Sequence, residues 1–477
     1  MDVVALYDSC RVGDLQKVKF LVEEREVELN TRDKWDSTPL YYACLCGHKE
    51  VVQYLLEHGA KCEANTFDGE RCLYGALTDE IRTILKKFRV ISSRTIRRDM
   101  YEECLRKIRE GAAYHDAVFV VDGVKFPVHR CILSVRCNYF AELFKTRWRD
   151  RQEVELKHAL VSPCAFGAVL DYIYYGRLQV HVDLIHECVM IAKQCQMHCL
   201  IDQIEDRMEK DASFLSMKPG LKVTSVVIEP PLDSLGLQMD LGLLGDRALP
   251  VELNKLVVGE LPFDPDLSQI YPDVCFSVEG LSFMCHKVFL SGRSDYFKAL
   301  IEDHFGETKL HGNTDIPVVT LHNITPEVFA RVVQYVYQDL CELSAENVYD
   351  ILCVADLYIL PGLKRLCANC MGEYIDIKNI ITILRTSRLF SLRKLENECA
   401  EFIAENLEEV IAQEDFIKLV KEDAANLQER HETDTIDIID EVRFYITNFI
   451  QTYSEMQEAN ERLKLIDDLL EELYLEG

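Results

Sequence analysis

The chain has little positive charge, few tryptophans and no long apolar run. Its 53 lysines and arginines face 81 aspartates and glutamates, which leaves a formal net charge of −28. A nucleic-acid-binding surface needs clustered Lys and Arg against phosphate, so this balance argues against nucleic acid as a partner. No apolar run approaches about 18 residues and no secretory signal opens the chain, so we expect no membrane partner and a cytoplasmic location.

One local exception to the acidic composition is a basic run from Lys86 to Arg109. Such a run usually forms a solvated linker or a helix face, and this is the interpretation we prefer. The alternatives are a weak nuclear-import signal, which would add a nuclear pool, and a docking site for an acidic partner.

Motifs for metal binding and catalysis are also missing. The 19 cysteines are odd in number and scattered, which favours reduced thiols that are buried as small apolar residues. Three groups each resemble half of a zinc site without the other half: Cys44-x-Cys46-x-His48, Cys195 to Cys199 with His198, and Cys367 to Cys370. His129 and His286 each precede a predicted helix, where an imidazole can fix the backbone. Since no phosphate loop or nucleophile motif occurs either, we predict no metal, no cofactor and no enzymatic activity.

What the chain does contain is one long segment twice, because Tyr114 to Phe144 returns without a gap as Tyr271 to Ile301. The two segments lie too far apart to be solenoid units of about 20 to 50 residues, so they indicate two copies of one globular domain. Each copy begins with alternating apolar residues and a tight turn, Asp122-Gly123 or Glu279-Gly280, which predicts a β-hairpin. Helix-spaced apolar residues follow, so each copy is expected to be a small α+β domain.

Several correlated positions in both copies resemble the BTB/POZ fold. They are a Phe-x-x-His-basic step, a later Tyr-Phe and a Tyr-x-Tyr: Phe126 to Arg130 with Phe283 to Lys287, Tyr139-Phe140 with Tyr296-Phe297, and Tyr172 to Tyr174 with Tyr335 to Tyr337. The resemblance implies a protein whose work is binding other proteins.

The resemblance to BTB domains also implies how the two copies pair. BTB dimers bury an aspartate near the domain start against a later basic residue, and the matching positions here are Asp116 with Arg130 and Asp273 with Lys287. Breaking a buried ion pair typically costs about 3–5 kcal/mol. Because one chain carries both copies, we prefer an intramolecular pseudo-dimer at high effective concentration over a homodimer of two chains. Solvated charges in unpaired copies are the alternative.

A shorter repeat precedes the two copies. Residues Ser37 to Ala60 follow the ankyrin pattern, in which Thr-Pro-Leu begins a helix and Gly ends it. Earlier residues reproduce this unit and a degraded one begins at Asp68, so about two and a half repeats are expected. Ankyrin proteins bind partners through hairpin tips, and the tip residues expected to bind a client here are Lys34, Trp35, Asp36 and Phe67. Trp35 is the expected anchor, with packing under the first BTB copy as the alternative.

The second copy carries a further element, Phe305-Gly306-Glu307. It resembles the apolar-x-Glu element by which BTB adaptors contact cullin, so the resemblance implies that Phe305 and Glu307 bind a cullin-three scaffold. A buried Phe anchor would contribute roughly 1.5–3 kcal/mol. The first copy has only the imperfect version Trp148-Arg149-Asp150. We therefore prefer the second copy as the cullin contact, with a solvated loop as the alternative.

The segments that follow the two copies differ. Prolines at several points between Asp211 and Leu267 predict an irregular linker after the first copy, with a partly ordered lid over that copy as the alternative. After the second copy, helix-spaced apolar residues from Ile377 to Leu419 look like the helical BACK extension of such adaptors. Heptad spacing from Asn448 to Leu475 predicts one amphipathic helix that packs back on those helices, with an intermolecular coiled coil as the alternative.

Together these patterns predict a multidomain, mainly α protein with α+β modules. The expected boundaries are 1–88 for ankyrin repeats, 89–113 for a basic helical linker, 114–210 for the first BTB/POZ copy, 211–267 for an irregular linker, 268–374 for the second copy, 375–447 for BACK-like helices and 448–477 for the C-terminal helix. The resemblance implies a non-enzymatic adaptor that brings an unknown client to a cullin-RING ubiquitin ligase. A cytoplasmic signalling scaffold in growth control and a nuclear BTB regulator are the alternatives.

Overall fold

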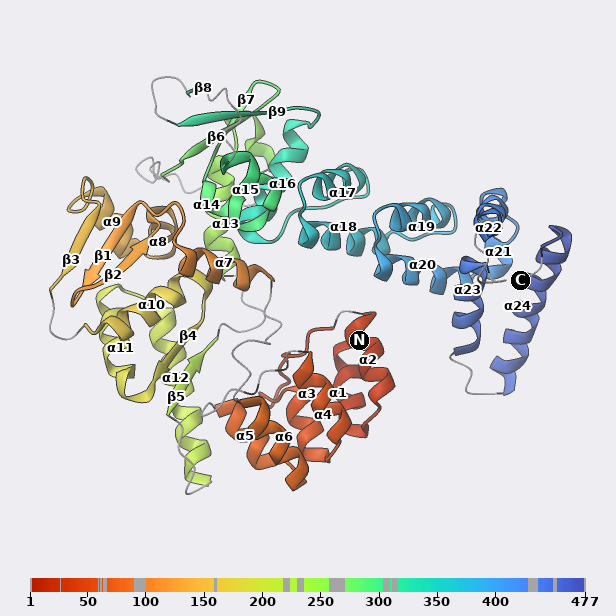
Figure 1. Cartoon of the computed structure of the whole chain (residues 1–477), viewed down its shortest axis with the longest axis horizontal. Coiled ribbons are helices and arrows are strands. Elements are labelled where there is room, and N and C mark those ends of the chain that lie inside the picture. Colours follow the sequence, from red (N-terminus) through yellow and green to blue (C-terminus); the bar gives the residue numbers. More distant parts are fainter. Residues whose placement is uncertain are drawn as a thin grey trace. The chain divides into compact units, whose positions relative to one another are not determined.

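The computed structural model divides into two compact units, 1–341 and 342–477. The residues that it describes are all except 1, 26, 59, 61, 63–66, 90–99, 158–160, 218–223, 230–235, 257–270, 303–308, 311–315, 428–435, 449–452 and 476–477. Helices dominate both units (Figure 1). The boundary between the units falls inside the predicted second copy, so the last two helices of that copy belong to the second unit.

The first unit begins with three pairs of helices. They are α1 (Asp2–Val12) with α2 (Leu15–Glu23), α3 (Pro39–Cys46) with α4 (Lys49–Glu57), and α5 (Phe67–Gly75) with α6 (Asp79–Arg89). As predicted, Thr38 caps the start of α3 by accepting from the backbone N–H of Tyr41, and Gly47 ends it with a left-handed φ of 85°. The third pair is complete, so the expectation of two and a half repeats was too low.

A histidine connects neighbouring ankyrin turns. The Nε2 of His48 lies 2.8 Å from the carbonyl oxygen of Arg11 and bridges backbone between two repeats. Gly13 has a φ of 86° and leaves room for the imidazole, because a Cβ there would lie 2.3 Å from His48 Nδ1. The residue that the sequence offered as half of a zinc site therefore has a structural role.

The first copy is a small sheet with helices packed on it. Its strands are β1 (Ala117–Val121), β2 (Val124–Val128), β3 (Glu153–Leu156) and β4 (Leu178–His181), and its helices are α8 (Arg130–Arg136), α9 (Asn138–Lys145), α10 (Pro163–Tyr175), α11 (Ile185–Gln194) and α12 (His198–Met217). The order β2-β1-β3 combines an antiparallel hairpin with a parallel neighbour. Phe119 on β1 is fully buried and contacts the rings of Phe140, Phe144, Trp148 and Phe166.

The second copy repeats this arrangement. Its elements in the first unit are β6 (Val274–Val278), β7 (Leu281–Cys285), β8 (Lys309–Leu310), β9 (Pro317–Leu321), α14 (Lys287–Arg293), α15 (Asp295–Glu302) and α16 (Pro326–Gln338). The order β7-β6-β9-β8 again has an antiparallel hairpin and a parallel third strand. Phe276 pairs with Phe283 across the hairpin as Phe119 pairs with Phe126 in the first copy. The prediction of two α+β domains of one fold is confirmed.

The segment between the copies is more ordered than predicted. It contains β5 (Ser225–Ile228), α13 (Gly236–Ala248) and a short 3₁₀ segment, η2 (Val251–Leu256). Strand β5 pairs antiparallel with β4 of the first copy. The prediction of an irregular linker was wrong for these elements, because the prolines lie between the elements and do not interrupt them.

Two helices that precede the copies connect one copy to the other. Helix α7 (Met100–Gly111) packs on α10 of the first copy and on α14 of the second, whereas α13 packs on α16 of the second and on α8 of the first. Figure 1 shows both helices between the two copies. Helix α8 of the first copy corresponds to α14 of the second, and α10 corresponds to α16. The contacts of α7 and of α13 are therefore equivalent, with the two copies exchanged. Each copy therefore holds the helix that precedes the other, as expected for two domains related by a pseudo-two-fold axis.

The described part of the predicted basic linker is a structural helix. In α7, Arg106 forms ion pairs with Glu103 and Glu110, and Arg109 lies 3.3 Å from Asp171 of α10. These arginines thus have carboxylate partners within the chain, which agrees with the interpretation as a helix face.

The second unit consists of helices alone among its described residues. They are α17 (Val348–Leu357), α18 (Pro361–Glu373), α19 (Ile380–Leu389), α20 (Arg393–Glu405), α21 (Leu407–Val410), α22 (Glu414–Leu427), α23 (Asp437–Asn448) and α24 (Tyr453–Glu472). Helix α24 packs on α21 and α23 and buries Ala459, Ile466 and Leu470. The prediction that the tail packs back on the preceding helices is confirmed, although its helix begins at Tyr453.

The same helical hairpin occurs twice at the start of this unit. Ile359 and Ser391 have positive φ angles, 54° and 55°, in the turns after α17 and α19. In each turn the next backbone N–H reaches back to a helix carbonyl at 2.8 Å, Leu360 to Ala355 and Leu392 to Ser387. These bonds satisfy carbonyls that the helix ends would otherwise leave without a partner.

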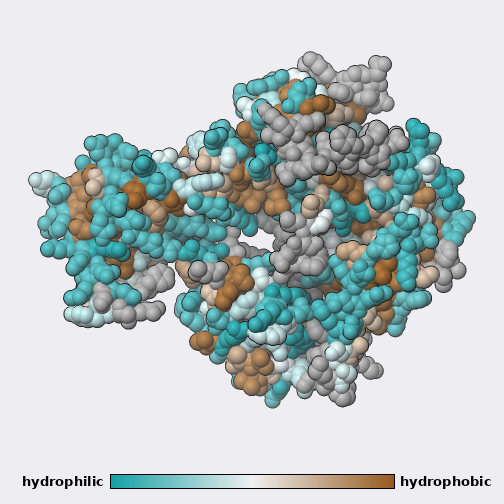
Figure 2. Space-filling view, turned by 180° about the vertical axis from the view of Figure 1, so that it is seen from behind, coloured by the Kyte–Doolittle hydropathy of each residue, from teal (hydrophilic) through white to brown (hydrophobic). Residues whose placement is uncertain are grey.

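The surface of the described residues is mostly hydrophilic. Figure 2 shows apolar residues in separate patches on the visible face and not in one continuous band. Among the described residues, none of the helices is both long and apolar enough to span a bilayer. In the same residues, no group of three or more His, Cys, Asp or Glu side chains is placed to hold a metal ion.

Candidate interaction surfaces

The first surface is the face on which the two copies meet. The hydroxyl of Tyr114 in the first copy lies beside Ser291 of the second, and the hydroxyl of Tyr271 in the second lies beside Ser134 of the first. Both serine hydroxyls are buried, and neither makes a hydrogen bond of good geometry within the described residues. Burial raises the pKa of both tyrosines. The four residues occupy matching positions in the two copies, so the contact is reciprocal.

Two arginines at matching helix ends bind the helix that precedes the other copy. Arg136 at the end of α8 forms an ion pair with Asp240 of α13. Arg293 at the end of α14 lies over the ring of Tyr101 of α7, with its guanidinium carbon 5.1 Å from the ring centroid. Tyr101 is fully buried and donates its hydroxyl hydrogen to the carbonyl oxygen of Tyr337. One side chain of α7 thus contacts two elements of the second copy.

The predicted charge pairs of the pairing face take a different form. Asp116 accepts a hydrogen bond from the backbone N–H of Arg130 at 2.8 Å, and Asp273 accepts one from the backbone N–H of Lys287 at 2.7 Å. Among the described residues, no ion pair joins either carboxylate to the basic side chain. The carboxylates cap the first N–H groups of α8 and α14, which a helix cannot satisfy by itself. The prediction of side-chain ion pairs is therefore corrected to helix capping.

The guanidinium of Arg130 has other partners. It donates to the carbonyl oxygens of Arg149 and Arg151, at 2.8 and 2.7 Å, and is almost completely buried. The side chain that was expected to pair with Asp116 instead fixes the loop that follows α9.

The two capping carboxylates influence each other across the pairing face. Burial, with a smaller contribution from the negative charge of Asp116, raises the pKa of Asp273 to about 6. Burial also raises the pKa of Asp116. Because burial disfavours the charged form of both carboxylates, their ionisation costs folding stability.

Histidines before α8 and α14 are held by tyrosines. Tyr174 Oη lies 2.9 Å from His129 Nδ1 and accepts from the backbone N–H of His129 at 2.8 Å, and Tyr337 makes the same two contacts with His286. Burial lowers the pKa of His129 to about 4. Both imidazoles are buried, which agrees with the predicted structural role.

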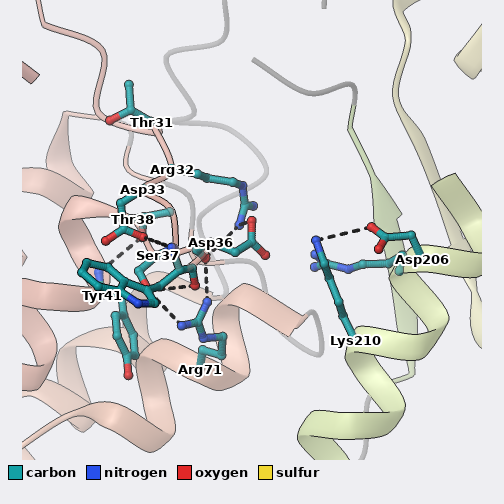
Figure 3. Close-up of polar contacts among 12 residues, drawn as sticks. Thr31, Arg32, Asp33, Asp36, Ser37, Thr38, Tyr41, Arg71, Asp206 and Lys210 are labelled. Carbon is teal, nitrogen blue, oxygen red and sulfur yellow. Dashed lines mark hydrogen bonds and ion pairs between the residues drawn. The ribbon is translucent and has the colours of Figure 1, made fainter. Parts of the chain in front are cut away.

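The second surface is the hairpin tip between the first two ankyrin repeats. Asp33 accepts from the backbone N–H groups of Trp35 and Ser37 at 2.9 and 3.0 Å, which forms a closed turn. Arg71 of α5 donates to the carbonyl oxygen of Asp36 at 2.6 Å and to the hydroxyl of Ser37 at 2.9 Å (Figure 3). The backbone of the tip is therefore held from two sides.

This held tip presents an aromatic side chain to solvent. Trp35 is 60% exposed, and the Nζ of Lys34 lies 4.2 Å from its ring centroid. Lys34, Trp35 and Asp36 are consecutive in this tip, and their role in binding a client stays a prediction. The side chain of Phe67 lies outside the described residues. Sequence reasoning missed Asp33 and Arg71, although an Asp two residues before the exposed position is a recognisable turn signal.

The predicted cullin contact, Phe305 with Glu307, lies outside the described residues. The matching residue of the first copy is described and has a different role. Trp148 is buried and packs against Phe119 and Phe144, at ring-centroid distances of 5.4 and 5.8 Å. In the first copy this position belongs to the domain core.

Comparison with known proteins agrees with this architecture. The BTB/POZ domain family matches residues 105–212 and 264–374, ankyrin repeats match 4–85 in three copies, and the family described as BTB And C-terminal Kelch matches 380–473. BTB/POZ domain-containing protein 3 of Schizosaccharomyces pombe is 30% identical over 498 residues, which cover 100% of this chain and 90% of the relative. This chain belongs to the family of ankyrin repeat and BTB/POZ domain-containing proteins.

Other relatives share all or part of this arrangement. An ankyrin repeat-containing protein of Saccharomyces cerevisiae is 27% identical, and the match covers 92% of this chain and 88% of that protein. The inhibitor of Bruton tyrosine kinase of Mus musculus is 23% identical over 71% of this chain, which corresponds to 29% of its own length. Ankyrin, BTB and BACK domains are interaction modules, so the family membership supports a protein that binds other proteins.

Proposed function

We propose that this protein is a non-enzymatic adaptor that brings a client, bound at the ankyrin tip, to a cullin-RING ubiquitin ligase in the cytoplasm. The observation that carries the proposal is the order of modules. An ankyrin block with a held, exposed Trp35 comes first, and a BTB domain followed directly by BACK helices comes last. One end of such a chain can hold a client while the other holds the ligase scaffold.

The second BTB copy is the proposed contact for a cullin-three scaffold. Phe305 would supply the apolar anchor and Glu307 a charge at its rim. The first copy is a poorer candidate, because its matching residue Trp148 is part of the core. Pairing of the two copies within one chain also uses the face by which a BTB domain would otherwise form a homodimer. One adaptor chain then carries one cullin site.

The ankyrin tip is the proposed site for the client. The turn built by Asp33 and Arg71 fixes the backbone before any partner arrives, so little conformational entropy is lost there on binding. Trp35 supplies the apolar surface and Lys34 a positive charge beside it. We expect the client segment to pair an apolar side chain with a carboxylate.

The test of the cullin contact is capture of purified cullin-three by the full-length chain. The variant Phe305→Ala with Glu307→Lys is expected to reduce capture by about tenfold or more, as for loss of a hot spot. Asp150→Lys in the first copy makes the matched charge change at an exposed position and should leave capture unchanged. Equal capture by all three proteins would remove Phe305 and Glu307 from the contact.

The client is tested separately with Trp35→Ala in cells. Proximity labelling with and without ligase inhibition should find proteins that accumulate on the wild-type chain under inhibition and that the Trp35→Ala chain does not label. Cullin labelling should be the same for both chains. Labelled clients whose amounts never respond to the inhibitor would contradict a ligase role.

A signalling scaffold is the second candidate. The similarity to a protein named for inhibiting Bruton tyrosine kinase, over 71% of this chain, supports it. A scaffold would retain its labelled partners without any change in their ubiquitination, so the same labelling experiment separates the two functions.

A further inference from the structure

The first BTB copy contains a pocket of about 590 Å³ beside the loop that follows α9. Its apolar lining comes mainly from Phe140, Trp148, Phe166 and Ile191, which are buried, and from Met190 of α11, which is 40% exposed. Arg147 and Arg151 of the loop and Lys157 lie at the same pocket. The pocket therefore combines an apolar floor with a rim that carries three basic side chains and one acidic side chain, Glu155.

The loop between α9 and β3, which carries these arginines, is fixed by contacts with buried residues of the first copy. The buried guanidinium of Arg130 binds the carbonyl oxygens of Arg149 and Arg151, and the backbone N–H of Trp148 donates to the carbonyl oxygen of Leu143 at 2.8 Å. Trp148 also packs into the aromatic core around Phe119. Because the backbone is held by these contacts, the arginine side chains leave it from fixed positions.

The arginines of this loop form no ion pairs with described residues, whereas Lys157 of the rim does. Arg147, Arg149 and Arg151 are exposed, and none of them forms an ion pair with a described residue. Asp150 lies among them, and Lys157 pairs with Glu155 at 3.0 Å. The loop thus places three exposed arginines within five residues of a chain whose net charge is −28. The matching positions of the second copy are His304, Gly306 and Thr308, so the basic rim belongs to the first copy alone.

We propose that this pocket binds a short acidic segment of a partner protein, with one apolar side chain in the pocket and its carboxylates on Arg147 and Arg151. The apolar floor needs an apolar occupant, and the arginine forks match carboxylates in geometry and charge. The rim would also exclude basic segments by repulsion. This binding is independent of the proposed cullin contact, which lies on the second copy.

The test measures fluorescence anisotropy of a labelled peptide in which Asp and Glu flank a Phe-Leu pair, titrated with the full-length protein. We expect saturable binding that weakens with added salt. Arg147→Glu with Arg151→Glu should weaken it by about tenfold or more. Lys418→Glu with Lys421→Glu on α22 makes the same change of net charge elsewhere and should leave binding within about twofold of wild type.

Two control peptides separate the pocket from charge alone. Replacing Phe-Leu by Ser-Ser should weaken binding by about tenfold, as expected for loss of one buried side chain, and replacing the acidic residues by Lys should abolish binding. Equal binding of the Ser-Ser peptide, no effect of the rim variant, or no saturable binding at all would overturn the proposal. Displacement of the peptide by a cullin-three fragment would also overturn it, since the pocket would then belong to the cullin contact.

Discussion

The two BTB copies differ on one face and agree on another. On the face where they meet, matching positions carry the same residues in both copies: Tyr114 and Tyr271, Ser134 and Ser291, His129 and His286, Tyr174 and Tyr337, and Arg136 and Arg293. In the loop after α9 and after α15, the first copy has a buried Trp148 between arginines and the second has Phe305 beside glycine. Most of the named pairing-face positions are therefore shared, with Arg130 against Lys287 as the exception, and the loop face is specific to each copy.

This difference has a physical reason. Pairing within one chain requires each copy to fit the other, so a change on the pairing face disturbs both domains and both of the helices that connect them. A change in an exposed side chain of the outer loop, such as Arg147, leaves that face in place. Duplication thus allows the two copies to carry the different partner sites that are proposed above. A homodimer of one domain would have to present the same loop twice.

The largest expected effect comes from breaking the contact between α7 and the second copy. Tyr101→Ala removes a fully buried ring that contacts Arg293 and the carbonyl of Tyr337. We expect a loss of about 3–5 kcal/mol in the free energy of unfolding of the first unit, measured by urea denaturation. Tyr453→Ala, at a residue that is 71% exposed, is the control and should change stability by less than about 0.5 kcal/mol. Equal effects of the two changes would contradict the described interface.

Acid should weaken the first copy through His129. Its pKa is lowered to about 4 in the fold, so the folded state binds a proton less readily than the unfolded chain does. The stabilisation is present above about pH 6.5 and is lost as the pH falls through 4, up to about 3 kcal/mol. His129→Asn removes this titration. Urea denaturation between pH 7 and pH 4 should therefore show that the variant loses less free energy of unfolding than the wild type as the pH falls. If the free energies of both proteins fall in parallel, His129 is not a buried neutral imidazole.

The likeness of the two pairing faces is tested by matched tyrosine changes. Tyr174→Phe and Tyr337→Phe each remove the hydroxyl that accepts from the backbone N–H of a buried histidine and that contacts Nδ1 of its imidazole. Each change should cost about 1–3 kcal/mol. Thermal unfolding of both variants should show losses of similar size. A large loss in one copy and none in the other would show that the two faces are not equivalent.

The smallest expected effect is a gain in the free energy of unfolding, at Asp273. Asp273 has a pKa raised to about 6, so its ionisation costs stability as the pH rises from 3.8 through 6. Asp273→Asn keeps an acceptor for the backbone N–H of Lys287 and removes the charge. We expect a gain of about 1 kcal/mol at pH 7 and no gain at pH 4, measured by urea denaturation. A loss of several kcal/mol at pH 7 would instead support an ion pair with Lys287.

Much of the fold followed from local pattern. The gap-free repeat predicted two domains of one topology, and Thr38, Pro39 and Gly47 marked the ends of an ankyrin helix. The sequence pattern did not predict the structure of segments whose structure depends on tertiary packing. Gly242 and Gly245 lie in the segment that was predicted to be a linker. In the structure they belong to α13, and because they lack a Cβ this helix lies close to Gln338 and Tyr337 of α16.

The candidate sites were predicted less completely than the fold. The exposure of Trp35 agreed with its expected role, but residue spacing could not reveal that Asp116 binds the backbone of Arg130 and not its guanidinium. The pocket of the first copy depends on Arg130 holding a distant loop, and no local pattern encodes that contact.

Light scattering of the full-length protein over a series of concentrations tests the central claim most directly. If the two BTB copies pair within one chain, the pairing face is already occupied. The measured mass should then be that of a single chain and should not rise with concentration. A stable dimer of whole chains at low concentration would contradict pairing within the chain, and with it the assignment of different partners to the two copies.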